Sequence, residues 1–334
     1  MEPLNRVVAS RTLVLIALLT AAPLDAQELT NRDSSMLTEL HEEGVPVKLA
    51  GTAIPAGEAS LFDTELVLGV VVAGEARAYA LNSLFHKENE VLNDVLGDTP
   101  IAATWCPVAH SGAVYTRTLD RRELELGVIG LDRGALVMYD RDTRSWWSQV
   151  TGEAMEGALS GRKLEKIPST VTTWASWRLR HPATTVYVVP GVARRLRFTE
   201  DSWAPMTLGG GPIRNEDLVV GVETGSVARA YLVRELAEAR VVNDTLAAQP
   251  VVVFLAGDSV TVRVLSRAVE GRTLSFAAEG ERLVDEETRS TWDPMTGLAL
   301  SGPLEGHSLA ALVSTPSLWY AWKRLHPDTD LWPR

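Results

Sequence analysis

Two stretches of sequence decide the fold, LVLGVVVAGEARAYA at residues 66–80 and LVVGVETGSVARAYL at residues 218–232. In the first, a β-rich run over 66–72 is followed by the turn signal Ala73-Gly74-Glu75 and by a second β-rich run over 76–80. This arrangement is typical of a two-stranded hairpin. Because the pattern returns 152 residues later, the sequence predicts an internal repeat.

The repeat extends to the end of both halves of the chain. The motifs that return are Asn93-Asp94 as Asn243-Asp244, Thr143-Arg144-Ser145 as Thr288-Arg289-Ser290, Trp147 as Trp292, Trp174 as Trp319, Trp177 as Trp322, and His181-Pro182 as His326-Pro327. The offset falls from 152 to 145 residues, so the second copy has lost seven. A repeat of this length is a whole small domain.

Short alternating runs predict strands through most of each copy, followed by one helix. In the first copy this helix is predicted over 171–180, capped by Ser169 or Thr170. The predicted fold class is β-rich α+β, with two tandem repeats of an antiparallel β domain, each closed by a C-terminal helix. The expected boundaries are a signal peptide at 1–26, a lead-in at 27–65, the first repeat at 66–189, a linker at 190–217 and the second repeat at 218–334.

The first residues resemble a secretory signal. Arg6 and Arg11 form a basic region, residues 13–22 are apolar, and small residues lead to a cleavage site after Ala26. The apolar run is too short to span a bilayer comfortably. We therefore expect a secreted or periplasmic protein with no stable membrane insertion after signal cleavage.

The charge of the chain limits its partners. The formal net charge is −11, which argues against nucleic acid, because phosphate recognition needs clustered lysine and arginine. A small molecule, a sugar or a peptide remains as a possible ligand.

The two copies differ most at a single cysteine. Residues 104–112 contain Cys106 and His110, whereas the matching stretch at 254–259 has neither residue type. His86 also has no counterpart in the second copy. This difference is typical of one functional domain beside a degenerate partner.

Several separated motifs of the first copy resemble one family. They are Val91-Leu92-Asn93-Asp94, Trp105-Cys106-Pro107, the stretch 137–143, Trp147-Ser148-Gln149, Trp177-Arg178 and His181-Pro182. In this order they resemble the bacterial and archaeal domain of unknown function 3179 family, which brings no established activity. The resemblance implies a second cysteine at position 109, where this chain has Ala109. Redox cycling within a C-x-x-C pair is thus excluded here.

Cys106 and His110 are the candidate catalytic residues. Pro107 forces a turn directly after a predicted strand, so we expect Cys106 to be exposed at the mouth of a β domain. A nearby imidazolium would lower the pKa of the thiol and make it a nucleophile. With His86, the same residues could bind zinc or copper. The alternative is a buried cysteine that acts as a small apolar residue.

A second set of residues could bind a ligand without catalysis. Its members are Trp105, Ser111, Arg144, Trp146 and Trp147. Tryptophan faces would suit sugars or cations, and the Arg144 guanidinium would suit a carboxylate or phosphate. For residues present in both copies, such as Asn93-Asp94 and Trp147, the alternative interpretation is a structural role.

Three functions compete on this evidence. The first is an exported thiol- or metal-dependent enzyme, or a redox-metal protein, centred on Cys106 and His110. The second is a non-catalytic extracytoplasmic module that binds a sugar or a peptide through tryptophan and arginine. The third is a structural envelope protein. The sequence alone leaves open whether the protein is an enzyme.

Overall fold

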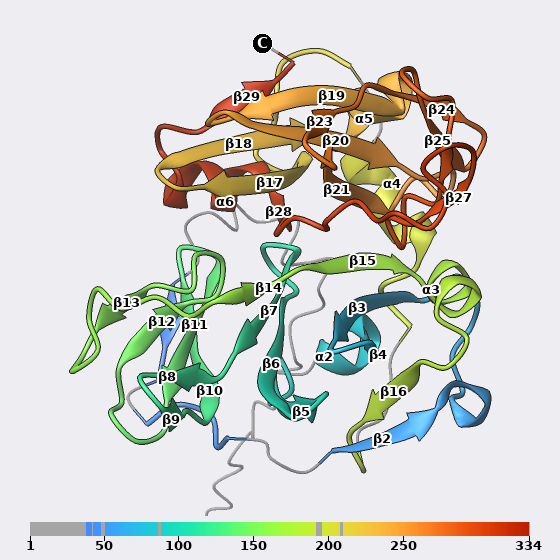
Figure 1. Cartoon of the computed structure of the whole chain (residues 1–334). Coiled ribbons are helices and arrows are strands. Elements are labelled where there is room, and N and C mark those ends of the chain that lie inside the picture. The colour runs from blue at the N-terminus through green and yellow to red at the C-terminus, as the bar shows by residue number, and fades with distance from the viewer. Residues whose placement is uncertain are drawn as a thin grey trace, which may run out of the picture.

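The structure is a computed structural model that describes residues 38–41, 43–47, 51–85, 88–191, 196–207 and 210–333. The described part of the protein is β-rich, with 48% of its residues in strands and 12% in helices, and its strands form several separate sheets. The two halves lie one above the other in Figure 1. The predicted signal peptide, residues 1–26, lies outside the described residues.

The first half is built on three sheets. In order across the first sheet, the strands are β15 (Ser169–Thr173), β3 (Leu66–Val72), β4 (Glu75–Ala80), β16 (Thr185–Val188) and β2 (Thr52–Pro55). The second sheet has the order β14 (Lys166–Ile167), β7 (Ser111–Thr116), β6 (Thr99–Cys106) and β5 (Val91–Leu96). The third sheet has the order β1 (Glu39–Leu40), β10 (Leu126–Asp132), β11 (Ala135–Asp140), β12 (Trp146–Ser148) and β13 (Ala154–Glu156). The short strands β8 (Thr118–Leu119) and β9 (Arg122–Glu123) pair separately. The helical elements are η2 (Ala56–Glu58), α2 (Leu81–Leu84) and α3 (Trp174–Arg180).

The second half contains three sheets with related strand orders. The first has the strand order β28 (Thr315–Leu318), β17 (Leu218–Thr224), β18 (Val227–Leu232) and β29 (Asp330–Trp332). The second has the order β19 (Val241–Leu246), β20 (Gln249–Leu255) and β21 (Val262–Ser266). The third has the order β24 (Phe276–Glu279), β25 (Arg282–Asp285), β26 (Thr291–Trp292) and β27 (Ala299–Ser301). The strands β22 (Ala268–Val269) and β23 (Arg272–Thr273) form a further pair. The helices are α5 (Val233–Ala239) and α6 (Trp319–Leu325), and α4 (Glu200–Thr207) lies between the halves in sequence.

The predicted hairpin over 66–80 is confirmed, because β3 and β4 pair antiparallel from Val67 with Ala80 to Val72 with Glu75. The strands are not all antiparallel, since β16 runs parallel to β4 and β29 runs parallel to β18. The predicted helix over 171–180 begins only at Trp174. Residues 169–173 instead pair with β3, so the helix cap is Thr173 rather than Ser169 or Thr170.

Repeated residues make the same bonds in both halves, as a structural role requires. Asp140 accepts a hydrogen bond from Trp147 Nε1 at 3.1 Å, and Asp285 accepts one from Trp292 Nε1 at 2.9 Å. A Cβ atom at Gly69 would overlap the Trp177 ring, so this strand position requires glycine.

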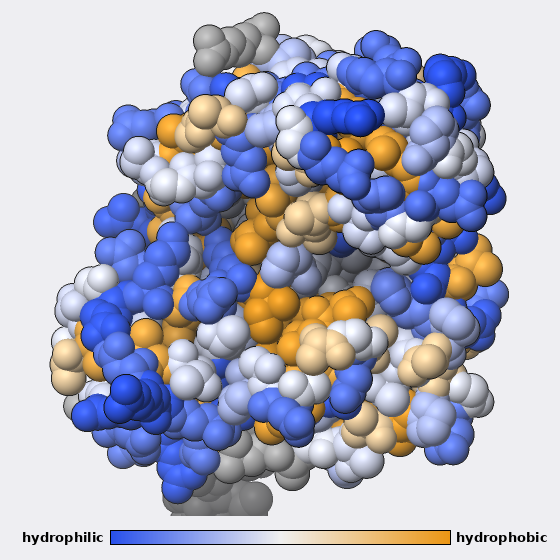
Figure 2. All heavy atoms as spheres, viewed as in Figure 1, coloured by the Kyte–Doolittle hydropathy of each residue, from blue (hydrophilic) through white to orange (hydrophobic). Residues whose placement is uncertain are grey.

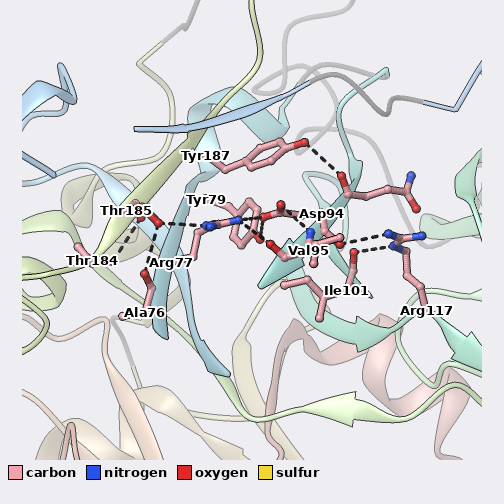
Figure 3. Close-up of polar contacts among 11 residues, drawn as sticks. Ala76, Arg77, Tyr79, Asp94, Val95, Ile101, Arg117, Thr184, Thr185 and Tyr187 are labelled. Atoms are coloured by element: carbon pink, nitrogen blue, oxygen red, sulfur yellow. Dashed lines mark hydrogen bonds and ion pairs between the residues drawn. The ribbon is translucent and has the colours of Figure 1, made fainter. Parts of the chain in front are cut away.

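A second repeated contact joins the hairpin to the neighbouring sheet (Figure 3). Arg77 Nη1 donates to Asp94 Oδ2 at 2.5 Å, and the Tyr79 hydroxyl donates to the same oxygen at 2.6 Å. The second half repeats the arrangement, with Asp244 Oδ2 lying 2.6 Å from Arg229 Nη1 and 2.8 Å from the Tyr231 hydroxyl. Asp94 and its counterpart therefore join sheets, which agrees with the structural interpretation of Asn93-Asp94.

The two halves share one core. A single buried hydrophobic cluster includes Leu66 and Cys106 from the first half and Leu218 and Tyr320 from the second. Across the interface, the Leu318 N–H donates to the Ala109 carbonyl at 2.8 Å. The last helix of the second half therefore begins against the loop that carries the cysteine.

Candidate functional site

Cys106 is the last residue of β6 and has no exposed surface. The expectation that its side chain lies at the mouth of a β domain is therefore wrong. The covering residues come from the other end of the chain. Leu318 is bonded to Ala109 in the cysteine loop, and the Tyr320 hydroxyl donates to the Gly134 carbonyl at 2.9 Å.

The surroundings of the thiol oppose its ionisation. Burial raises the pKa of Cys106 to about 12, and the charge of Glu90 contributes to the rise. Backbone N–H groups oppose this effect only in part, among them the N–H of Ala109, which lies 3.3 Å from Cys106 Sγ. The expected thiolate stabilised by His110 is thus wrong, because loss of solvation outweighs the favourable contacts.

His110 faces aromatic rings rather than a charged partner. Its ring centroid lies 6.0 Å from that of Trp105 and 5.7 Å from that of Phe198. Its Nδ1 atom is buried and has no hydrogen-bond partner among the residues that the structure describes. Burial lowers the pKa of His110 to about 4, so the imidazole is neutral at pH 7. A neutral imidazole and a neutral thiol form neither an ion pair nor a ready nucleophile.

The tentative metal set cannot be assembled from these residues alone. His86 lies outside the described residues, and in the described part of the chain no three histidine, cysteine, aspartate or glutamate side chains gather as a metal site. Zinc or copper binding by Cys106, His110 and His86 stays a prediction.

The tryptophans predicted to bind a ligand lie mostly inside the protein. Trp105 and Trp147 have no exposed surface, and Trp146 is half-buried. Ser111 donates from its hydroxyl to the buried Gln149 side chain at 2.7 Å. Arg144 lies on the surface, where its Nη2 donates to a backbone carbonyl at 2.8 Å. The five residues therefore present no shared binding face.

A segment between the halves covers the aromatic side of the cysteine loop. Trp203 stacks on Trp105 with ring centroids 6.4 Å apart, and Phe198 packs edge-on against the same ring at 5.5 Å. The buried Asn82 side chain holds this segment, because its Oδ1 accepts the N–H groups of Arg197 at 2.7 Å and of Phe198 at 2.9 Å.

An open cavity of about 360 Å³ lies where the two halves meet, away from the cysteine loop. Its lining residues are Lys163, Leu164, Glu165, Lys166, Glu223, Gly225 and Val313. Figure 2 shows the face hollowed between the halves, with hydrophilic and hydrophobic residues around the hollow. We refer to this cavity as the interface cleft.

Glu223 is the centre of charge in the interface cleft. Its Oε1 accepts a hydrogen bond from Lys166 Nζ at 2.8 Å, and its Oε2 accepts one from Lys163 Nζ at 3.0 Å. Lys166 Nζ also donates to the Thr315 hydroxyl at 3.2 Å, and His326 Nε2 lies 3.4 Å from Glu223 Oε1. Lys166 belongs to the first half and Glu223 to the second, so the ion pair joins the halves.

Burial shapes the titration of this pair. Loss of solvation lowers the pKa of Lys166 even though Glu223 attracts the proton. Burial acts to raise the pKa of Glu223, but the attraction of Lys166 and the other positive neighbours lowers it below its ordinary value. Both groups lie in a site that is partly shielded from solvent, where charge interactions are stronger than in water.

Comparison with known proteins identifies the family of the chain. A family model described as a protein of unknown function (DUF3179) matches residues 43–329. The chain belongs to the DUF3179 family. No curated protein and no solved structure matches the chain.

The DUF3179 match includes both halves, so the interface cleft lies within the extent of the family. In the described part of this DUF3179 protein, no helix has the length and apolar character needed to cross a membrane.

Sequence analysis missed the interface cleft of the DUF3179 protein. One signal was available, because the second copy places the charged Glu223 where the first copy has Val71, 152 residues earlier. A carboxylate on a strand that is otherwise β-rich and apolar indicates a specific partner. The partner, Lys166, follows from the packing of the halves and could not be read from the pattern.

Proposed function

We propose that this DUF3179 protein is an exported, non-catalytic binding protein that holds a small ligand in the interface cleft. The observation that carries the proposal is the cleft itself, a cavity of about 360 Å³ with the Lys166–Glu223 ion pair in its wall. Ligand pockets are commonly clefts of about 300–1,000 Å³ in which a few polar groups fix orientation.

The lining has the composition of a recognition site. Gly225 and Val313 offer small or apolar surface, and the charged side chains offer specific contacts. The ion pair is fixed in position by a further contact, since Lys166 Nζ also donates a hydrogen bond to the Thr315 hydroxyl. Preorganised polar groups lose less entropy on binding, which favours affinity.

A thiol- or metal-dependent enzyme at Cys106 and His110 is the other candidate function. The burial of Cys106 disfavours it, because a substrate could reach the sulfur only if the residues packed around the cysteine loop moved. Neither the pKa of the thiol nor that of the imidazole suits catalysis near neutral pH.

We also propose that the two halves arose as tandem copies and that export removes residues 1–26. The related strand orders and the repeated aspartate–tryptophan contacts support the first idea. The basic and apolar residues before Ala26 support the second. In this account the second copy supplies one wall of the binding cleft.

Filling the interface cleft is expected to abolish ligand binding. We expect Val313→Trp to occupy the cavity while leaving every charged lining residue in place. The matched control is Val95→Trp, at a strand residue that is 51% exposed and does not line the cleft. Thermal shift with a panel of small amino acids, peptides, carboxylates, amines and sugars provides the measurement.

At least one compound should raise the melting temperature of the wild type and of Val95→Trp, but not of Val313→Trp. Two results would contradict the proposal: no response from the wild type to any compound, or an equal response from Val313→Trp.

A further inference from the structure

The charges that line the interface cleft are balanced. The lining includes two lysines, Lys163 and Lys166, and two glutamates, Glu165 and Glu223. The neighbouring His326 adds no full charge at pH 7, because burial lowers its pKa below the ordinary value. A wall of this kind favours neither a simple anion nor a simple cation, since each would meet like charge as well as opposite charge.

The two positive charges of the lining lie against the same carboxylate. Lys163 and Lys166 share the single carboxylate of Glu223, which leaves one positive charge uncompensated there. The Lys163 side chain is 54% exposed, so its ammonium can reach a ligand without breaking the buried contact of Lys166. A ligand carboxylate is the natural partner for these two lysines.

A negative charge remains at Glu165. In the described part of the chain, its carboxylate has no hydrogen-bond or ion-pair partner, although its backbone carbonyl accepts the Thr116 N–H at 2.9 Å. Glu165 lies between Lys163 and Lys166 in sequence and lines the same cavity. A ligand ammonium would complete the pairing of charges on this wall.

The cavity also limits the size and kind of ligand. Its volume of about 360 Å³ corresponds to about a dozen waters at roughly 30 Å³ each. None of its described lining residues is aromatic, so these residues offer no flat face on which a ring would stack. The small residues Val313 and Gly225 in the lining leave room for a short side chain.

We propose that the ligand of the interface cleft is a small zwitterion, a free amino acid or dipeptide, whose carboxylate binds at Lys163 and Lys166 and whose ammonium binds at Glu165. This inference rests on the proposed function, because it names the ligand class of the same cleft. The residues that recognise the ligand are then lysines and a glutamate, instead of the tryptophans and the arginine that the sequence suggested.

Three probes of similar size separate the contributions of the two charges. Glycylglycine carries both charges, N-acetylglycine only the carboxylate, and glycylglycinamide only the ammonium. Calorimetric titration of the purified protein should show glycylglycine binding at least tenfold more tightly than either of the others. Glu165→Gln should reduce the advantage of glycylglycine over N-acetylglycine, and the control Glu156→Gln, at an exposed residue outside the cleft, should preserve it.

The outcomes distinguish this inference from the proposed function. Equal affinity for glycylglycine and for N-acetylglycine or glycylglycinamide, lost in Val313→Trp, would overturn the zwitterion while keeping the cleft as the binding site. An unchanged advantage of glycylglycine in Glu165→Gln would overturn the role of Glu165. Absence of binding by all three probes and by the wider panel would overturn both.

Discussion

Replacing Asp217 with alanine is expected to lower the free energy of unfolding by about 3–5 kcal/mol. Asp217 is fully buried directly before β17, and its carboxylate accepts hydrogen bonds from Arg234 Nη1 at 2.7 Å and from Arg214 Nη2 at 2.6 Å. Only 4% of the Arg234 side chain is exposed. Without Asp217 its guanidinium would lose the fully buried carboxylate that compensates its charge, and burying an uncompensated charge is costly.

The adjacent residue provides the control. Glu216 is 61% exposed on its side chain and lies 3.9 Å from Arg214, so Glu216→Ala should change the free energy of unfolding by less than about 1 kcal/mol. Chemical denaturation of both variants measures the difference. Equal stability of Asp217→Ala and the wild type would show that the buried pair makes no net contribution to the second half.

Acidification from pH 7 to pH 4 is expected to cost about 3 kcal/mol of stability through His110 alone. Burial lowers the pKa of this imidazole from 6.5 to about 4, and one pKa unit corresponds to about 1.4 kcal/mol. The unfolded chain therefore binds a proton at a pH where the native protein does not. The stability that His110 provides is complete above pH 6.5 and is lost as the pH falls toward 4.

His110→Asn isolates this effect. Asparagine suits the backbone φ of 48° at this position and does not titrate. Two half-buried histidines, His181 and His326, also have a lowered pKa and remain in both proteins, so they cancel in the comparison. Unfolding free energies measured at steps between pH 7 and pH 4 should fall more steeply for the wild type. Parallel curves would contradict a neutral, buried His110.

The repeat allowed much of the fold to be predicted from sequence. The hairpin over 66–80 follows from local alternation and a glycine turn, which depend on neighbouring residues only. Residues kept in both copies, such as Asp94 and Trp147, proved to make structural contacts. The start of the helix after β15 was missed because pairing of residues 169–173 with β3 overrides their helical pattern.

The cysteine loop shows why the site was harder to predict. Pro107 does produce a turn after β6, as the sequence indicates. Whether that turn is exposed depends on Tyr320, more than two hundred residues later, whose hydroxyl bonds Gly134 beside the loop. Burial then reverses the expected chemistry, raising the pKa of the thiol instead of lowering it.

The interface cleft depends on the same long-range packing. Lys166 and Glu223 are 57 residues apart and meet only when the halves dock. Loss of Cys106 and His110 in the second copy suggested a degenerate partner, yet that copy contributes Glu223 to the cleft. The absence of Cys106 and His110 counterparts from the second half therefore gives no information about residues such as Glu223 that occur only there.

The closed cysteine loop, which directs the functional assignment to the interface cleft, is tested most directly by the alkylation rate of Cys106. Iodoacetamide should modify the native protein at pH 7.5 at least a hundredfold more slowly than the urea-unfolded protein, because the sulfur has no exposed surface and its pKa is about 12. Modification of the native protein at the rate of the unfolded chain would show an accessible, ionisable thiol. It would contradict the closed cysteine loop and favour a function that depends on Cys106.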